Sequence, residues 1–251
     1  LSQDVYRVIT EVIEEYWRVD LIRAYNLKPK TKLLFYGPPG CGKSLCAEAL
    51  AAELGLPILY CRLDSLISSY LGDTSTNIRK VFDFASKSTW VMLFDEFDAI
   101  GKSRNDFNEH GELKRVVNSF LQIIDNFEGQ SLIIACTNHE HLLDRAIWRR
   151  FDDVIYFGKP NQEDISNLIR IKTKTFRWGN VDINELSRKM IGMSHYEVER
   201  ICHESIKKCI LNGLDSLTTD IIEQQYDREL KRIRAMGEGN NEKFTTSEDR
   251  N

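Results

Sequence analysis

The sequence lacks any apolar run approaching the about 20 residues that a membrane-spanning helix needs. It shows no N-terminal signal peptide. It also lacks a strong excess of either charge, since the formal net charge is −4 at pH 7, and this balance gives no basic field that would favour nucleic acid as a partner. The 6 cysteines form no Cys-x-x-Cys pair, which is typical of a reducing compartment rather than of a disulfide framework. We therefore expect a cytoplasmic protein with no membrane partner.

Apolar residues are plentiful enough for a real core. They make up 42% of the 251 residues, while charged residues make up 29%. These values suit one large domain, or one medium domain with a smaller one. The sequence begins with Leu1 rather than methionine, and we expect it to be a fragment of a longer chain.

Residues 37–44 fit the phosphate-binding pattern G-x-x-x-x-G-K-[ST]. A short apolar strand is predicted before this loop, at 32–36, and a helix after it, at 44–54. Such a strand, turn and helix N-terminus direct backbone N–H groups toward one point, which suits a polyphosphate. We expect Lys43 to reach the β- and γ-phosphates and Ser44 to hold Mg²⁺ through its hydroxyl. Nucleotide contacts are expected along the loop, from Pro39, Gly40, Cys41, Gly42, Lys43, Ser44 and Leu45.

A second signal is the apolar run 90–94, which is followed by Asp95 and Glu96. In an open parallel sheet, ligands bind beyond the carboxyl ends of the strands. Asp95 is therefore expected to bind the same Mg²⁺ as Ser44, through water. Glu96 is expected to polarise the attacking water as a general base.

The remaining pattern divides the chain into four parts. Further strands are predicted at 57–62, 132–136 and 154–157, and helices alone follow, at about 162–176, 182–190, 195–212 and 216–235. The predicted parts are an N-terminal helix and linker (1–29), a large α/β subdomain (30–160), a helical subdomain (161–236) and a disordered tail (237–251).

Taken in order, these motifs resemble an AAA+ ATPase of the AAA clade over roughly residues 30 to 230. Residues 37–44 match the family's Walker A motif, and 91–96 match Walker B. Asn138 stands where the family keeps its sensor 1 residue, which helps to orient the attacking water. Arg149 and Arg150 resemble the arginines that reach the nucleotide of the next subunit, and the resemblance places the finger role on Arg150, with Arg149 beside it.

Three further sites follow from the resemblance. Tyr70 and Leu71 match the family's pore loop, which grips an extended polypeptide in the ring's channel. The run 125–127 resembles the inter-subunit signalling element, with Asn126 in place of glycine. Where much of the clade has a Gly-Ala pair in its helical lid, this chain has His195-Tyr196, and we expect His195 to contact the nucleotide.

The resemblance implies a P-loop NTPase αβα sandwich with a parallel sheet of order 5-1-4-3-2 and a C-terminal helical lid. It also implies a homo-oligomer, usually a hexameric ring, that hydrolyses ATP with Mg²⁺ and remodels or threads a protein substrate, in some cases for a partner protease or effector. Two alternatives stay open: a nucleic-acid-directed motor, and a regulatory switch that binds ATP and scarcely hydrolyses it. The acidic balance and Tyr70 count against the first, while Glu96 and the two arginines count against the second.

Overall fold

The computed structural model describes residues 2–62, 74–98, 112–127 and 129–245. The chain divides into two compact units, Leu1–Gly158 (unit 1) and Lys159–Asn251 (unit 2), and each is described by itself. The predicted pore-loop residues Tyr70 and Leu71 lie outside the described residues.

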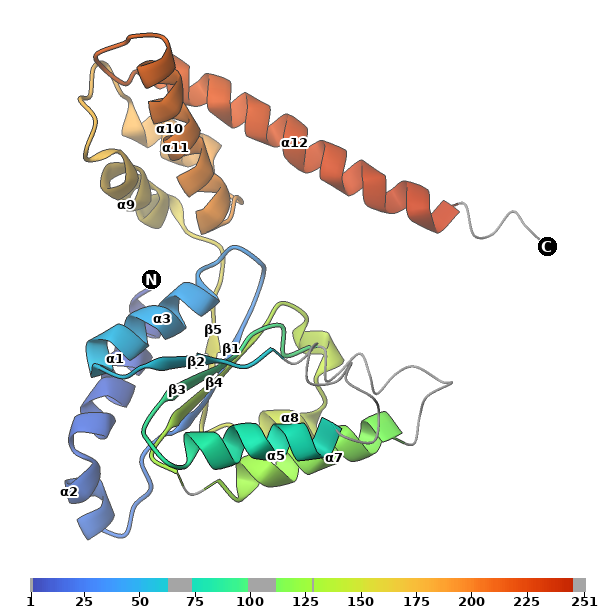
Figure 1. Ribbon diagram of the computed structural model, residues 1–251. Helices are drawn as coiled ribbons and strands as arrows, with labels where there is room; N and C mark the ends of the chain where they lie inside the picture. The colour runs from blue at the N-terminus through green and yellow to red at the C-terminus, as the bar shows by residue number, and fades with distance from the viewer. Residues whose placement is uncertain (1, 63–73, 99–111, 128, 246–251) are drawn as a thin grey trace. The chain divides into compact units, whose positions relative to one another are not determined.

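Unit 1 is built on a parallel sheet (Figure 1). Its strands run in the order β2-β3-β4-β1-β5, and every neighbouring pair is parallel. Read from the other edge, this is 5-1-4-3-2, so the predicted α/β class and strand order are confirmed. Because the strands are parallel, the loops that follow β1, β3 and β4 all leave the sheet at the carboxyl ends of the strands. The strand bounds are β1 Lys32–Tyr36, β2 Ile58–Tyr60, β3 Val91–Phe94, β4 Leu132–Thr137 and β5 Asp153–Tyr156.

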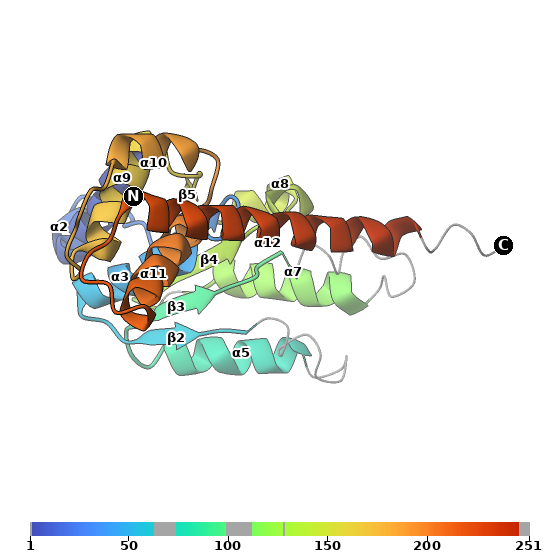
Figure 2. The same ribbon diagram turned by 90° about the horizontal axis from the view of Figure 1, so that it is seen from above.

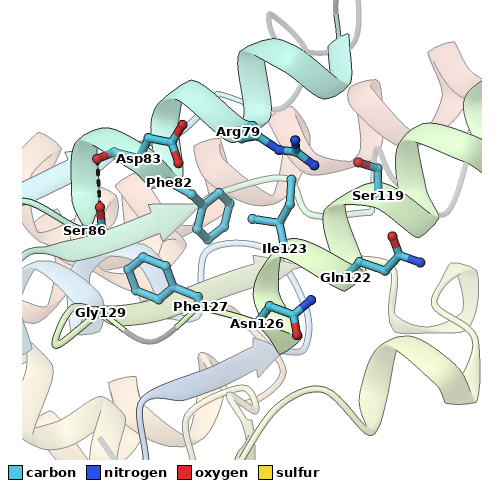
Figure 3. A pocket seen from close by; sticks show the side chains of 10 residues that line it. All are labelled: Arg79, Phe82, Asp83, Ser86, Ser119, Gln122, Ile123, Asn126, Phe127 and Gly129. Carbon is cyan, nitrogen blue, oxygen red and sulfur yellow. Dashed lines mark hydrogen bonds between the residues drawn. The ribbon is translucent and has the colours of Figure 1, made fainter.

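Helices cover both faces of this sheet (Figures 1 and 2). One face carries α1 (Gln3–Trp17) and α3 (Lys43–Leu54), and the other carries α5 (Thr74–Ala85) and α7 (Glu112–Asp125). Figure 3 shows the side chains that line a groove between α5 and α7. A one-turn helix, α8 (Arg145–Trp148), and the 3₁₀ turn η1 (Glu140–Leu142) lie between β4 and β5 in the chain.

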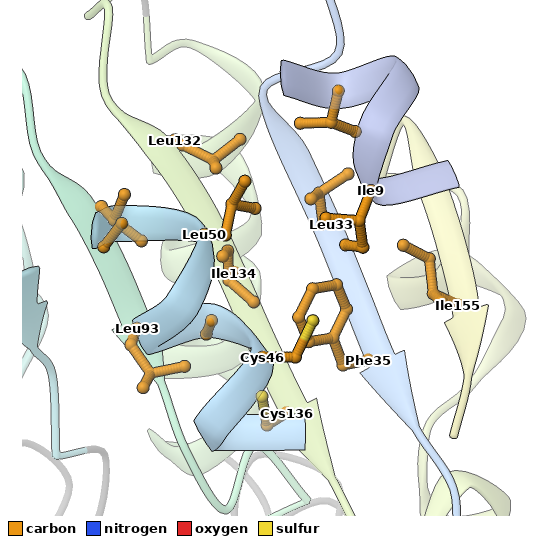
Figure 4. Close-up of a cluster of buried hydrophobic side chains, with 14 of the residues drawn as sticks. Ile9, Leu33, Phe35, Cys46, Leu50, Leu93, Leu132, Ile134, Cys136 and Ile155 are labelled. Atoms are coloured by element: carbon orange, nitrogen blue, oxygen red, sulfur yellow. The ribbon is translucent and has the colours of Figure 1, made fainter. Parts of the chain in front are cut away.

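Alternation along the strands builds the two cores of unit 1. Leu33 and Phe35 pack toward α1 and α3, while Leu34 between them packs toward α5 and α7. Successive side chains of a strand point to opposite faces, so a strand that is apolar throughout must be covered on both sides. Figure 4 shows the first of these cores, in which Leu50 of α3 and Ile9 of α1 meet the sheet.

The single N-terminal helix predicted within residues 1–29 is wrong in one respect, because the structure has two helices there. The helix α1 ends at Trp17, and a short α2 (Val19–Ala24) follows after Arg18, whose φ of −109° and ψ of 23° interrupt the helical path. The apolar periodicity continues across Arg18, so the sequence pattern could not reveal the break. While α1 buries Val5, Ile9 and Val12, no residue of α2 is buried.

Unit 2 is built of helices in its described residues, apart from one isolated β-bridge between Trp178 and Leu217. Its helices are α9 (Gln162–Thr173), α10 (Ile183–Lys189), α11 (His195–Leu211) and α12 (Thr219–Thr245). Asn161 and Ser194 begin α9 and α11 with capping boxes, in which the cap side chain and the third helical residue bond to each other's backbone N–H. Apolar side chains from all four helices form one core.

The last helix extends beyond its predicted end at residue 235, because α12 continues to Thr245. The low apolar content after residue 236 predicts disorder, but it says little about extending an existing helix. Propagation adds one hydrogen bond for each residue fixed, whereas nucleation is the costly step. No proline interrupts this stretch, so the helix can continue.

Candidate functional site

Three glycines give the loop after β1 its shape. Gly37, Gly40 and Gly42 have φ values of 130°, 71° and 92°, in the region that side chains disfavour. At Gly37 a Cβ would also lie 2.4 Å from the carbonyl oxygen of Phe157, so this position admits no side chain. The loop therefore turns sharply enough to bring its backbone N–H groups to the start of α3.

Lys43 is held across this loop rather than extended into solvent. Its side chain is 6% exposed, and Nζ donates hydrogen bonds to the carbonyl oxygens of Gly37 (2.7 Å) and Pro38 (2.9 Å). Burial lowers the pKa of Lys43 from its usual value, against the opposing effect of nearby groups that include Asp95. The ammonium group is thus fixed inside the concave side of the loop, where a phosphate would meet it.

Ser44 and Asp95 meet at the carboxyl edge of the sheet, as predicted from their separate motifs. Ser44 Oγ donates a hydrogen bond of 2.7 Å to Asp95 Oδ2. One hydroxyl and one carboxylate suit Mg²⁺, which keeps several waters and takes its other ligands from phosphate oxygens. Among the described residues, no group of three or more His, Cys, Asp and Glu side chains could hold a metal by itself.

Glu96 has an unusual backbone. Its φ is 51°, and among the described residues only Asn26 is another non-glycine residue with positive φ. Its N–H donates to Asp95 Oδ1 at 2.9 Å, and the next N–H, of Phe97, donates to the carbonyl of Cys136 at 2.8 Å. These bonds hold the turn while the Glu96 side chain stays exposed beyond the strand. The sequence gives no signal of this conformation.

A buried polar contact lies behind the site, and the sequence analysis missed it. Asp98 is 3% exposed, and it accepts a 3.1 Å hydrogen bond from the buried hydroxyl of Thr137. The same hydroxyl accepts a 3.0 Å bond from the N–H of His139. Asn138 is half-buried between these two anchored residues, directly after β4 as predicted. Asp98 and Thr137 therefore position the backbone on which Asn138 sits.

Arg150 is paired within its own chain. Its Nε donates to Asp125 Oδ2 at 3.1 Å, and its Nη1 donates to the carbonyl of Ala146 at 2.9 Å. Asp125 ends α7 and begins the run predicted to signal between subunits, so two residues predicted separately lie together. Arg149 beside it is exposed.

His195 belongs to unit 2, as the first residue of α11. Burial lowers the pKa of His195 from its usual value, so the neutral imidazole is favoured. Its Nδ1 is buried and lacks a hydrogen-bond partner among the described residues. An unpartnered buried nitrogen is a feature that a ligand could satisfy.

Leu45, the last residue of the loop predicted to contact nucleotide, lies in unit 1 and is 63% exposed.

A parallel sheet of this order, with a glycine-rich loop leading into α3 and a carboxylate at the end of β3, defines a P-loop nucleotide-binding domain. The model of the ATPase family associated with various cellular activities (AAA) matches residues 33–159. The chain belongs to this family, which confirms the resemblance and the prediction of an ATPase domain that binds nucleotide.

Three relatives show how widely this similarity extends. The chain is 49% identical over 211 residues to an uncharacterised AAA family ATPase, y4kL, of Sinorhizobium fredii, an alignment that covers 84% of this chain and 64% of the relative. It is 31% identical over 211 residues to the proteasome-activating nucleotidase of Methanoregula boonei, an alignment that covers 81% of this chain and 48% of that relative. It is 30% identical over 202 residues to the ATP-dependent zinc metalloprotease FtsH 3 of Sphaerobacter thermophilus, an alignment that covers 78% of this chain and 41% of that relative.

The chain thus spans less than two thirds of the length of each of these relatives. Within the part that the structure describes, no helix has both the length and the apolar character needed to cross a membrane.

Proposed function

We propose that this protein hydrolyses ATP to ADP and phosphate, with Mg²⁺, and that it acts as a ring-forming motor on protein substrates. The observation that carries the proposal is the meeting of Ser44 and Asp95 at 2.7 Å beside the buried Lys43. Two motifs far apart in the sequence supply a cation, a metal-binding pair and the adjacent Glu96 at one edge of the sheet. This is the set of groups that phosphoryl transfer to water requires.

Each side chain then has a distinct role. The loop amides and Lys43 bind the phosphates, and Ser44 and Asp95 hold Mg²⁺, which neutralises charge on the phosphate oxygens. Glu96 accepts a proton from the attacking water, and Asn138 orients that water. Asp98 and Thr137 keep Asn138 in place through the bonds that flank it.

Arg150 is proposed to act in trans, on the nucleotide of the next subunit, with Arg149 beside it. Charge builds on the γ-phosphoryl oxygens as the bond breaks, and an inserted guanidinium contributes roughly 10³–10⁵ in rate. In a single chain Asp125 holds this guanidinium. Assembly would exchange the carboxylate for the phosphate.

Protein as the substrate is supported by the names of the relatives, which include a proteasome-activating nucleotidase and an ATP-dependent metalloprotease. The balanced charge of the chain does not favour nucleic acid. Threading through a central pore, by Tyr70 and Leu71, is part of this proposal, and so is a protease or another effector as partner. We further propose that a large α/β subdomain and a helical lid bind the nucleotide between them, with a contact from His195, and that the protein works in the cytoplasm.

The experiment is the ATPase rate per subunit over a range of protein concentrations, with Glu96→Gln as the blank. We expect the rate to rise where oligomers form and to vanish in the blank. Lys207→Gln serves as a control, because Lys207 is exposed and pairs with Glu204 of the same helix, α11. A rate that does not depend on concentration would contradict the trans role of Arg150. No hydrolysis despite ATP binding would favour the regulatory switch.

A further inference from the structure

We infer that the exposed face of α2 on one copy of this chain docks into the groove between α5 and α7 on a second copy, in a head-to-tail contact. This inference rests on the proposed assembly and names the surfaces that would make it. It starts from α2, a helix of 6 residues that buries none of them. So short a helix is not stable in water by itself, because helices of this length depend on tertiary packing. Among the described residues α2 contacts α1, yet its apolar surface stays exposed and available to a further partner.

The side chains around α2 have the character of a buried surface. Four large apolar residues are exposed there: Trp17 at 65%, Leu21 at 57%, Tyr25 at 73% and Leu27 at 63%. Scattered exposed apolar residues are ordinary, but a cluster with two aromatic rings on one short segment is typical of an interaction site. We call these four residues the α2 face.

The groove between α5 and α7 offers a matching surface (Figure 3). It has a volume of about 510 Å³, and its lining is mixed, with the apolar side chains of Phe82, Ile123 and Phe127 among polar and charged ones. The Phe127 ring packs edge-on against Phe82, with centroids 5.4 Å apart. The Phe127 ring also lies so close to Gly129 that a Cβ there would approach it to 2.3 Å, so this position admits no side chain while the ring stays in place.

Charges on the two surfaces are complementary. Arg79 and Asp83 are one turn apart on α5, at the rim of the groove, and both are exposed. Asp20 and Arg23 are almost one turn apart on α2, and both are exposed as well. When Asp20 faces Arg79, Arg23 can face Asp83. None of the four makes an ion pair with another described residue of its own chain.

The position of the groove also points to a second copy as the occupant. Asn126 lines the groove, and the preceding residue, Asp125, holds Arg150, the residue proposed to act on a neighbouring subunit. The groove therefore lies next to residues that we propose to face a neighbouring subunit. Because the α2 face and the groove are different surfaces, the contact is heterologous, and repeating it generates a ring or a filament.

The apolar part of the contact is tested by sedimentation velocity in the Glu96→Gln background with ATP, which keeps nucleotide intact. Leu21→Ser removes the centre of the α2 face, and Leu211→Ser is its control, because Leu211 is another exposed leucine, at 85%, in unit 2. We expect Leu21→Ser to raise the concentration needed for assembly at least tenfold and Leu211→Ser to leave it unchanged. Equal behaviour of the two variants would overturn the inference, as would a parent protein that remains monomeric at every soluble concentration.

Charge reversal tests the register of the contact. Asp20→Arg and Arg79→Asp should each weaken assembly, because each puts like charges opposite one another. An equimolar mixture of the two variants should recover assembly. In a mixed contact, Asp20 of one variant faces Arg79 of the other, or the arginine introduced at position 20 faces the aspartate introduced at position 79. Asp20→Arg mixed with Lys174→Asp, a reversal at an exposed lysine of unit 2, should not recover it. Equal recovery in both mixtures would exclude the pairing of Asp20 with Arg79.

Two further readouts separate this inference from the proposed function. A photo-crosslinking amino acid at position 21 should join to peptides covering 77–86 or 119–127 of an isotope-labelled second copy, and crosslinks elsewhere would refute the contact. Binding of a fluorescent ATP analogue should be unchanged in Leu21→Ser. If the parent protein binds no nucleotide, the proposed function fails, yet crosslinking still reports whether the surfaces meet.

Discussion

Glu96 combines the predicted catalytic role with a strained backbone. A non-glycine residue in the left-handed region costs of order 1–3 kcal/mol and persists only where its surroundings enforce it. Here the enforcing bonds run from the N–H of Glu96 to Asp95 and from the N–H of Phe97 to Cys136. The strain turns the chain immediately after β3, so that neighbouring residues serve different purposes: Asp95 faces Ser44, Glu96 is exposed and Phe97 is buried.

This conformation leads to a prediction in which stability and activity change in opposite directions. Glu96→Gly should raise the free energy of unfolding of unit 1 by about 1 kcal/mol, because glycine adopts a positive φ without steric cost. It should also abolish ATP hydrolysis, because the proposed general base is lost. Urea unfolding and an ATPase assay measure the two effects. Glu96→Gln is the control: it should lose activity with no gain in stability, and an equal gain would show that the backbone is not strained.

At this scale the sequence predicted residue types better than residue geometry. That Ser44 and Asp95 meet beside Lys43 could be predicted, because the chemistry of phosphate binding demands those groups in that order along the chain. The φ of Glu96 and the buried bond between Asp98 and Thr137 could not, since both depend on contacts between β3 and β4 that no local pattern encodes. The pairing of Arg150 with Asp125 joins residues 25 positions apart for the same reason.

Among the elements, α1 is tied to β5 by one lysine. Lys30 Nζ lies 2.9 Å from Asp153 Oδ2 and 3.3 Å from Glu11 Oε2, and its backbone N–H donates to Glu15 at 2.7 Å. The hydrogen bond to Asp153 is the main reason that the pKa of Lys30 is raised. A lysine whose pKa is raised by folding contributes stability below its unfolded pKa, and that stability is lost as the pH rises through the folded value.

Lys30→Met should therefore lower the free energy of unfolding at pH 7 by about 1 kcal/mol, because it leaves the partly buried Asp153 without its cation. Urea unfolding at pH 7 and above pH 10.5 measures the effect, and the difference from the parent protein should shrink at the higher pH. Lys28→Met is the matched control, since Lys28 is exposed and has no ion pair with a described residue. A loss of stability as large in Lys28→Met would remove the specific role of Lys30.

Element boundaries show what periodicity can and cannot reveal. The strand order followed from the family resemblance, and the strands themselves from apolar runs such as 132–136, which can only be satisfied by burial on both faces. The break at Arg18 was missed because the apolar spacing continues across it, and only the backbone angles reveal it. The end of α12 was missed because composition measures burial, whereas helix extension depends on propagation.

At the scale of the whole molecule, nucleotide should link the stability of the two units. Trp178 is the one tryptophan of unit 2, so a variant with Trp17, Trp90 and Trp148 changed to phenylalanine reports on unit 2 by fluorescence. We expect ADP with Mg²⁺ to raise the urea midpoint of this signal, because a ligand at 100 times its Kd stabilises what it contacts by about 2.7 kcal/mol. His195→Ala should reduce the shift, since its buried Nδ1 is the proposed contact.

His203→Ala provides the comparison for this experiment, because His203 lies on the same helix, α11, and is exposed. It should leave the shift unchanged. A second variant, Trp178→Phe, keeps the tryptophans of unit 1 and reports on that unit. If nucleotide moves only the transition of unit 1, the nucleotide contacts unit 1 alone and the role of His195 is wrong.

Because the cysteines are buried, thiol labelling of the native protein reports when and where it opens. All six cysteines are buried and none forms a disulfide: Cys41, Cys46, Cys61 and Cys136 lie in unit 1, Cys202 and Cys209 in unit 2. A maleimide added to the folded chain finds nothing to alkylate until a core opens. Because each unit has its own thiols, the modified peptides identify the unit that opened. Their accumulation over time gives the rate of opening, and no substitution in the protein is needed.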